Sequence, residues 1–253
     1  MFSLTKFNDQ KNDSNFNYKI FYKHKTESTN DDAILKIEEN EYEENMVFIA
    51  DQQTKGRGRQ NRSWYTKPDC HLAFSLILTP KINSKNAGLI SLMAGVSVLE
   101  GLKKITNLNF KLKWPNDIIY NKNKIAGILI ETKQINDELV YIVGIGININ
   151  ENIDDFPLDL RNKVTSLNIL KQKQYEKESI LYNILKSISI NYNEIHSIHS
   201  KWISLCGHID QKISFHFNKK KIIGQFMGIT KNGHAVINIK NENHIFPNGE
   251  LFL

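Results

Sequence analysis

The period of apolar positions changes several times along the chain, and these changes predict both strands and helices. The expected strands cover residues 18–24, 46–50, 70–79, 110–114, 118–120, 125–132 and 138–148, and the expected helices cover 28–40, 86–105 and 176–199. Ser28, followed three residues later by the acidic Asp31, predicts where the first helix begins. Closely spaced strands after residue 110 favour antiparallel hairpins. We therefore expect an α+β fold.

The two ends of the chain differ from its middle in composition and apolar pattern. Residues 1–17 are rich in Asn, Asp and Lys with little apolar periodicity, so we expect a poorly ordered tail there. From Ile209 onward, short strands alternate with turns at Asn218-Lys219 and Asn232-Gly233, and the second pair predicts a type I′ hairpin. These changes predict a main domain over 18–205 and a small β-barrel-like domain over 206–253.

Composition excludes several classes of protein. Hydrophobic residues make up 40% of the 253 positions and charged residues 24%, with 13 Gly and 5 Pro, so the chain is neither collagen-like nor disordered throughout. No apolar run approaches the roughly 18 residues that cross a bilayer. Cys70 and Cys206 lie far apart without metal-ligand spacing, which predicts neither a disulfide nor a zinc site. We expect a soluble cytoplasmic protein.

The net charge of +6 is less informative than the position of the arginines. The chain has 29 Lys but only 4 Arg, and Arg57, Arg59 and Arg62 fall within six residues beside Gly56 and Gly58. Guanidinium groups bind phosphate or carboxylate in a bidentate manner, and glycines let backbone amides approach an anion closely. The loop fits neither a Walker A loop nor a dinucleotide fingerprint. The alternatives are a solvated basic loop or one that touches nucleic acid.

A second motif is Lys113-Trp114-Pro115-Asn116-Asp117. Proline fixes a rigid turn, so the flanking polar residues are held at the end of a strand. Lysine there is suited to phosphate, while Asn116 and Asp117 offer the oxygen ligands that Mg²⁺ prefers. An ordinary hairpin turn would explain Pro, Asn and Asp, but not the preceding Lys and Trp together.

Glycines also interrupt two expected strands, at Gly127, Gly144 and Gly146. Glycine weakens a strand interior unless something lies against the backbone, so these positions indicate a ligand pressed onto the sheet. A bulge or tight packing is the alternative. Lys124, at the entrance of one of these strands, would need an anionic partner if buried, or would extend into water from a hairpin end. Trp64 could stack on an adenine or simply pack in the core.

In this order and spacing the motifs resemble the catalytic domain of biotin protein ligases. The matching segments are residues 28–30, 53–64, 113–117, 124–131 and 144–148. The resemblance implies a central mixed β-sheet flanked by helices, as in class II aminoacyl-tRNA synthetases, and a small SH3-like C-terminal β-barrel. This chain has Asn61 where the family usually has glycine, a change that asparagine's tolerance of left-handed φ could accommodate. Because fewer than 20 residues precede the first expected strand, we expect the monofunctional type, without an N-terminal DNA-binding domain.

The resemblance also implies an activity. Such enzymes join biotin and ATP into biotinyl-5′-adenylate and then biotinylate a lysine of the biotin carboxyl carrier domain of a biotin-dependent carboxylase. Biotin, ATP and Mg²⁺ are therefore the expected small molecules, and the carrier domain is the expected partner. No nucleic-acid or membrane partner is expected, and a homodimer is left open. Residues 55–64 are expected to order over the adenylate.

The roles implied by the family fall into four groups. Lys124, Arg59 and Asp117 are expected to be catalytic. Biotin is expected to contact Ser28, Thr29, Asn30, Gln53, Gly56, Arg57, Arg59, Lys124, Gly127, Gly144 and Gly146. ATP or the adenylate is expected to contact Arg59, Arg62, Trp64, Lys113, Asn116, Lys124 and Asn148, and Asp117 is the candidate Mg²⁺ ligand.

Three alternatives remain at this point. A lipoate ligase of the same fold would share most of these motifs. A basic nucleic-acid-binding module would explain the charge and the arginine loop, but not the glycines in buried strands. A biotin-binding protein without catalysis would not need Lys124 and Asp117 together.

Overall fold

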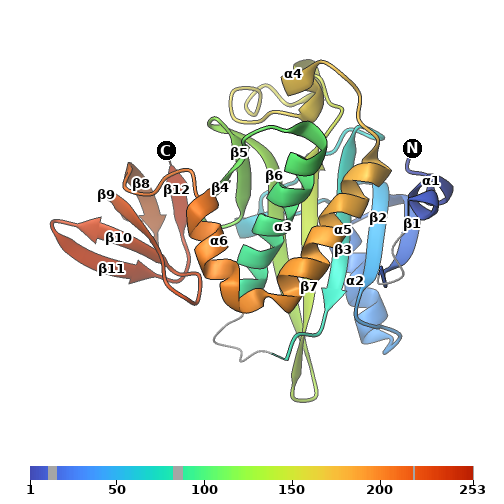
Figure 1. The fold of residues 1–253 in the computed structure, drawn as a ribbon, viewed down its shortest axis with the longest axis horizontal. Coiled ribbons are helices and arrows are strands. Elements are labelled where there is room, and N and C mark those ends of the chain that lie inside the picture. The colour runs from blue at the N-terminus through green and yellow to red at the C-terminus, as the bar shows by residue number, and fades with distance from the viewer. Residues whose placement is uncertain (11–15, 82–87, 219, 253) are drawn as a thin grey trace.

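A seven-stranded sheet forms the centre of the computed structural model, which describes residues 1–10, 16–81, 88–218 and 220–252 (Figure 1). The strands are β1 (Lys19–Thr26), β2 (Met46–Gln53), β3 (His71–Leu78), β4 (Lys111–Lys113), β5 (Asp117–Tyr120), β6 (Asn123–Ile135) and β7 (Glu138–Asn148). Their order is β1-β2-β3-β7-β6-β5-β4. Only β1 and β2 pair in parallel, so the sheet is mixed, as predicted.

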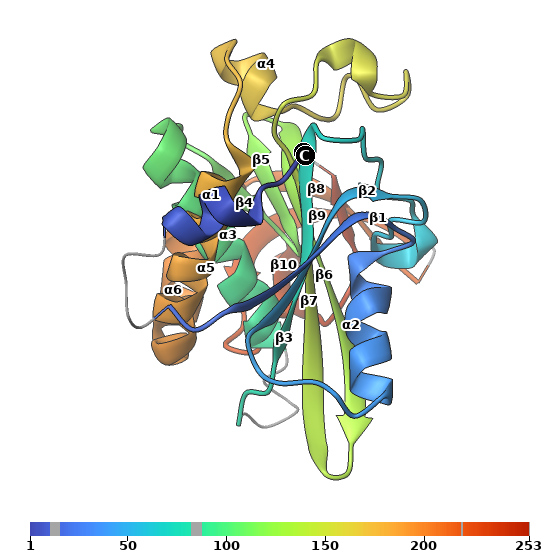
Figure 2. The same ribbon diagram turned by 90° about the vertical axis from the view of Figure 1, so that its right-hand side faces the viewer.

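Helices cover both faces of this sheet (Figure 2). One face carries α3 (Gly88–Thr106), α5 (Lys177–Asn193) and α6 (Ile198–Leu205), and the other carries α2 (Thr29–Glu38). On α2, Ala33 and Ile37 are buried against Phe48 and Ile77 of the sheet. Because both faces are covered, every residue of β3 is buried, which explains its unbroken apolar run. A short helix, α4 (Leu167–Lys171), follows the long connection after β7.

The C-terminal part forms a five-stranded antiparallel sheet. Its strands are β8 (Lys212–Phe217), β9 (Lys220–Ile229), β10 (Ala235–Ile239), β11 (Glu242–Phe246) and β12 (Glu250–Phe252), in the order β11-β10-β9-β8-β12. Trp114 joins it to the main sheet, because its ring lies 5.8 Å from that of Phe215 and its Nε1 donates to Gly233 O at 2.9 Å. Buried side chains from both sheets share one large core cluster, and a second, smaller cluster lies between α2 and the main sheet. The domain boundary near residue 206 stays a prediction.

The N-terminal residues differ from the predicted tail. Helix α1 (Leu4–Asp9) begins at Ser3, whose Oγ accepts from Lys6 N, and packs against α5. Phe2 and Phe7 are both buried. The prediction of a poorly ordered tail is therefore wrong for residues 1–10, because two isolated aromatic residues find their burial in tertiary contacts. The predicted tail also includes residues 11–15, which lie outside the described residues.

Two further local predictions are wrong. The helix expected over 176–199 is broken, because Glu194 leaves the helical region at φ −105° and ψ 28° and lets the chain turn into α6. The turn at Asn232-Gly233 was expected to be type I′, but only Gly233 of the pair has positive φ. The two-residue turn with both central residues at positive φ is instead Lys240-Asn241, between the paired residues Ile239 and Glu242. Of the predicted turn at Asn218-Lys219, residue 219 lies outside the described residues.

Within the described residues, no helix is long and apolar enough to cross a membrane.

Candidate active site

A cavity of about 750 Å³ opens where the glycine-containing parts of β6 and β7 meet the loops around them. It is lined by the start of α2, the loop after β2, the β4–β5 turn, the connection after β7 and the start of β12. All the predicted site residues except Gly56 line it. The structure thus brings together side chains that lie far apart in the sequence.

Gly127, Gly144 and Gly146 form the floor of the cavity. Gly127 and Gly146 are paired across β6 and β7. A Cβ on Gly146 would lie 2.4 Å from the Trp64 indole, and one on Gly144 would lie 2.3 Å from Asn30 Oδ1. In this structure side chains of the protein itself, from Trp64 and Asn30, lie against these backbones. The interpretation that a ligand lies there stays a prediction.

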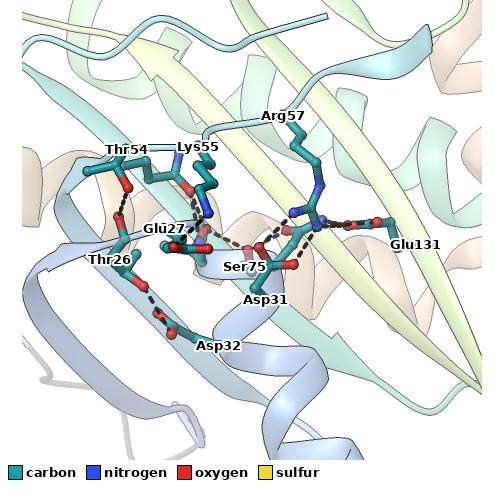
Figure 3. A network of polar contacts seen from close by, with 12 residues as sticks. Thr26, Glu27, Asp31, Asp32, Thr54, Lys55, Arg57, Ser75 and Glu131 are labelled. Carbon is teal, nitrogen blue, oxygen red and sulfur yellow. Dashed lines mark hydrogen bonds and ion pairs between the residues drawn. The ribbon is translucent and has the colours of Figure 1, made fainter. Parts of the chain in front are cut away.

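The polar wall beside this floor is built around the first turn of α2 (Figure 3). Gln53 Oε1 accepts hydrogen bonds from Thr29 N at 2.8 Å and from Thr29 Oγ1 at 3.2 Å. Ser75 Oγ donates to Asn30 Oδ1 at 2.5 Å and lies 2.7 Å from Thr29 Oγ1. Ser28 stands at the N-cap position as predicted, but its side chain makes no capping bond. Ser28 lines the cavity, so its hydroxyl can serve a ligand bound there.

Asp31, the expected capping partner of Ser28, forms an ion pair with Arg57 instead. The Arg57 guanidinium donates two bonds to Asp31, at 2.6 and 2.7 Å, and a third to Glu131 at 3.2 Å (Figure 3). The hydrogen bonds to Asp31, together with the charge of Glu131, raise the pKa of Arg57 despite its partial burial. Two carboxylates thus neutralise this arginine, which ties the loop after β2 to α2 and β6.

Lys124 is held in place from two directions. Its Nζ lies 2.6 Å from Asp117 Oδ1 and 5.3 Å from the centre of the Trp64 ring. Its backbone is held on both sides, because Lys124 N donates to Lys163 O at 2.8 Å and Thr165 N donates to Lys124 O at 2.9 Å. The ammonium group therefore projects from a fixed backbone into the cavity.

Arg59, Arg62 and Lys113 are among the further cations that line the same cavity. Arg62 pairs with Glu250 of β12. Arg59 makes no ion pair or side-chain hydrogen bond with the described residues, and Lys113 likewise has none. Burial lowers the pKa of both groups, against the nearby charges of Asp117 and Glu250. Two cations held with little compensation in a half-buried cavity fit the binding of an anionic ligand.

The family of the chain can be decided by comparison with known sequences. A sequence profile of the Biotin/lipoate A/B protein ligase family matches residues 22–150. The chain belongs to this family. It is 34% identical over 160 residues to the bifunctional ligase/repressor BirA of Bacillus spizizenii, covering 63% of this chain and 49% of that protein. It is 31% identical over 130 residues to the biotin--[acetyl-CoA-carboxylase] ligase of Mycobacterium tuberculosis, covering 50% and 47%. The chain spans about half the length of these relatives.

Solved structures of the family extend the similarity over nearly the whole chain. The biotin protein ligase of Aquifex aeolicus in complex with biotin and ATP superimposes with a TM-score of 0.80 at 29% identity, covering 92% of this chain and 97% of that one. Asn61, the residue expected to replace a glycine of the family, adopts φ 58°. This left-handed conformation is one that asparagine tolerates.

Several predicted residues of this family site hold its framework together. Asn116 Nδ2 donates to Ile128 O at 2.6 Å, and Asn148 Nδ2 donates to Thr165 O at 3.0 Å. Gly56 does not line the cavity but contacts Trp64 across the loop. Its carbonyl accepts a hydrogen bond from Trp64 N at 2.8 Å. A Cβ on Gly56 would lie 2.8 Å from Trp64 O.

Sequence reasoning missed two parts of the site. Glu250 has no local signal, because its partner Arg62 is distant in the chain. The connection over residues 149–166 holds the Lys124 backbone, yet its sequence lacks periodicity. The capping serine Ser166, which accepts from Ile169 N at 3.0 Å, was its only available signal.

The described residues contain no group of three or more His, Cys, Asp or Glu side chains able to hold a metal ion. Asp117 and Glu250 are the carboxylates whose charges act on Arg59 and Lys113, and Asp117 also contacts Lys124. Such a set fits Mg²⁺ only where phosphates supply most of the ligands, as is common for this ion.

Proposed function

We propose that this protein is an ATP-dependent biotin protein ligase. In the proposed reaction, biotin and ATP give biotinyl-5′-adenylate and pyrophosphate, and biotin then passes to a lysine of a carboxylase carrier domain. The names of the relatives from Bacillus and Mycobacterium and the Aquifex complex with biotin and ATP support this assignment. The observation that carries it is the placement of Lys124, with its ammonium group beside the glycine floor and among the cavity cations.

The first step requires two anions to meet. The carboxylate of biotin is ionised at pH 7 and repels the α-phosphate, so the site must supply positive charge rather than a base. In the proposal, Lys124 bridges the two groups, while Arg59, Arg62 and Lys113 neutralise the phosphates. Asp117 and Glu250 hold Lys124 and Arg62 until an anionic substrate competes for them. Preorganised cations of this kind lower the barrier without reorganising solvent.

Biotin would lie against the polar wall. Ser28, Thr29 and Gln53 offer hydrogen-bonding groups for its neutral ureido ring, and Gly127 and Gly146 provide a floor without side chains. The Trp64 indole now covers that floor, and its Nε1 is buried without a hydrogen-bond partner among the described residues. We therefore expect Trp64 to shift when a ligand enters. Asn30, Gly144 and Arg57 would act by holding this wall in place.

The nucleotide would occupy the side of the cavity lined by Arg62, Lys113, Asn116 and Asn148. Mg²⁺ would enter with the phosphates, with Asp117 as its protein ligand, and would screen their negative charge. Residues 55–64 would cover the adenylate and keep water from this mixed anhydride.

The second step needs an uncharged acceptor amine. A free lysine has a pKa near 10.4, so it must lose a proton before it attacks the acyl carbon and releases AMP. Asp117 is the candidate base, because its carboxylate already contacts the ammonium group of Lys124. The cytoplasm, where ATP and carboxylases are available, is the compartment that fits this reaction.

A lipoate ligase is the second candidate, because the matching family includes both activities. A nucleic-acid-binding loop is disfavoured, since Arg57 and Arg62 are already paired with carboxylates. Pyrophosphate exchange into ATP, measured with biotin and with lipoate, tests the proposal. We expect exchange with biotin and little with lipoate. Exchange with lipoate alone would reassign the substrate, and exchange with neither would reject ligase activity.

A further inference from the structure

A buried ion pair lies outside the cavity and takes no part in the proposed chemistry. The Asp51 carboxylate at the end of β2 is 1% exposed, and Lys177, the first residue of α5, is 5% exposed. Lys177 Nζ donates to Asp51 Oδ1 at 2.5 Å, and Tyr22 OH donates to Oδ2 at 2.5 Å. Burial opposes ionisation of Asp51, but the hydrogen bonds from Lys177 and Tyr22 outweigh it and lower the pKa of the carboxyl. The Asp51 carboxyl is therefore ionised.

The N-terminal segment completes the environment of this pair. Phe2 N donates to both carboxylate oxygens of Asp51, at 3.1 Å each, while the Phe2 ring packs 5.9 Å from that of Tyr22. Ser3 N donates to Glu178 Oε1 on the first turn of α5 at 2.6 Å. Asp51 is thus saturated with donors and closed off from water.

The position of Asp51 gives this pair its significance. Residues 54–68, here called the lid loop, leave the sheet just after β2 and return to it at β3. Asp51 lies two residues before Gln53, and its carbonyl accepts from Asp69 N at 3.3 Å, so the two ends of the lid loop meet at this residue. Lys177 connects that meeting point to α5, which lies beside the sheet (Figure 1).

Stability alone does not account for a pair of this kind. Desolvating two charges costs about as much as their attraction returns, and apolar residues of similar size often serve equally well. What the pair adds is geometry, because a saturated carboxylate accepts only one arrangement of its donors. Here that arrangement fixes the end of β2 relative to α5, the helix that packs closely on α3 at Gly101 and Ile184.

We propose that Asp51 and Lys177 are positioning residues that anchor the base of the lid loop and so hold Gln53 and Arg59 over the bound adenylate. The functional half of this proposal rests on the ligase activity proposed above. The structural half concerns the lid loop alone. Neither side chain lines the cavity, so both act through the backbone that they hold.

The test combines Asp51→Asn with Lys177→Met in the full chain, which removes both charges and leaves an acceptor for Phe2 N and Tyr22 OH. Hydrogen exchange is followed at the lid base, where Thr54 N and Lys55 N donate to Thr26 O and Glu27 O. Release of adenylate formed in the site from biotin and ATP is timed in parallel. The matched control is Lys133→Met with Glu38→Gln, which removes a 2.6 Å pair between β6 and α2 away from the lid loop.

We expect the double variant to melt near the wild-type temperature, to exchange faster at the lid base and to release adenylate about tenfold faster. The control should match wild type in both measurements. If the double variant shows wild-type hydrogen exchange at the lid base, the proposed anchor is wrong. If its hydrogen exchange is faster but its adenylate release is unchanged, the anchor does not act on the adenylate. If wild type forms no adenylate, the ligase proposal fails, and the exchange rates alone decide the anchor. Should the double variant not fold, Phe2→Ala, which uncovers the pair, is expected to give the same two changes.

Discussion

At the scale of single residues, the three clustered arginines show what a sequence can and cannot reveal. The pattern predicts an anion-binding loop, and all three side chains do reach the cavity. Yet Arg57 is neutralised by Asp31 and Glu131, Arg62 pairs with Glu250, and only Arg59 has no ion pair among the described residues. These partners come from other elements, so residue type and spacing could not distinguish the three roles.

Lys124→Ala should reduce biotin-dependent pyrophosphate exchange by about 10²–10³-fold, the cost typical of losing one preorganised charge or donor at a reacting oxygen. The fold should persist, because the Lys124 backbone bonds to Lys163 and Thr165 remain. Lys133→Ala is the matched control, since it removes a lysine from the same strand outside the cavity. Near-wild-type exchange by Lys124→Ala would refute the proposed role.

Arg59→Ala is expected to let the adenylate escape, because the lid loop then neutralises its phosphate through Arg62 alone. Adenylate release, measured by gel filtration after a single turnover, should accelerate by about tenfold or more. Arg161→Ala serves as the control, since that arginine pairs with Asp154 at the surface. Equal retention in the two variants would argue against Arg59 as part of the cover.

At the scale of elements, the strands were the easier prediction. Alternation and short apolar runs located β1, β2, β3, β6 and β7. Burial between two helical layers explains the apolar sequences of β2 and β3. The break between α5 and α6 was not predictable, since apolar spacing continues through Glu194 and only tertiary contact redirects the chain. Helix α1 was missed for the related reason that its burial depends on α5.

Alanine substitutions at the two glycines inside α3 distinguish the effect of helix propensity on stability from the effect of packing. A Cβ on Gly95 would meet Leu112 Cδ2 at 3.4 Å, an ordinary contact, whereas one on Gly101 would lie 2.6 Å from Ile184 Cγ1. Gly95→Ala should stabilise the protein by about 1 kcal/mol. Gly101→Ala should destabilise it by about 1–3 kcal/mol, because α3 and α5 must move apart. Urea unfolding measures both, and equal effects of the two substitutions would contradict the packing described here.

At the scale of the whole molecule, titration of buried groups sets the pH dependence of folding. Burial raises the pKa of Glu151 to about 7, so the folded protein holds this proton more tightly than the unfolded chain. The resulting stabilisation is complete below the ordinary pKa of 4.5 and is lost as the pH rises through about 7. Burial lowers the pKa of His71 to about 4, so the folded protein binds this proton more weakly than the unfolded chain. Acidification therefore destabilises the fold through His71.

Glu151→Gln cannot ionise, and it should remove the first of these terms. Relative to wild type, the variant should gain roughly 3 kcal/mol in the free energy of unfolding between pH 4 and pH 8, from the size of the pKa change. Urea unfolding at a series of pH values measures the difference, with the exposed Glu138→Gln as control. A difference between Glu151→Gln and wild type that stays constant with pH would contradict the account.

The overall architecture was predictable because the order of motifs, taken together, is more specific than any one of them. The way in which the C-terminal sheet completes the site was not. Glu250 reaches the cavity from β12, the last strand, which pairs with β8. A contact between Glu250 and Arg62, so far apart in the chain, leaves no periodic trace in the sequence.

A crystal structure with biotin and a non-hydrolysable ATP analogue bound together tests the central claim most directly. The account predicts that Lys124 Nζ leaves Asp117 to lie between the biotin carboxylate and the α-phosphate, with Arg59 on the phosphates. A complex in which Lys124 and Arg59 both point away from the two ligands would contradict it.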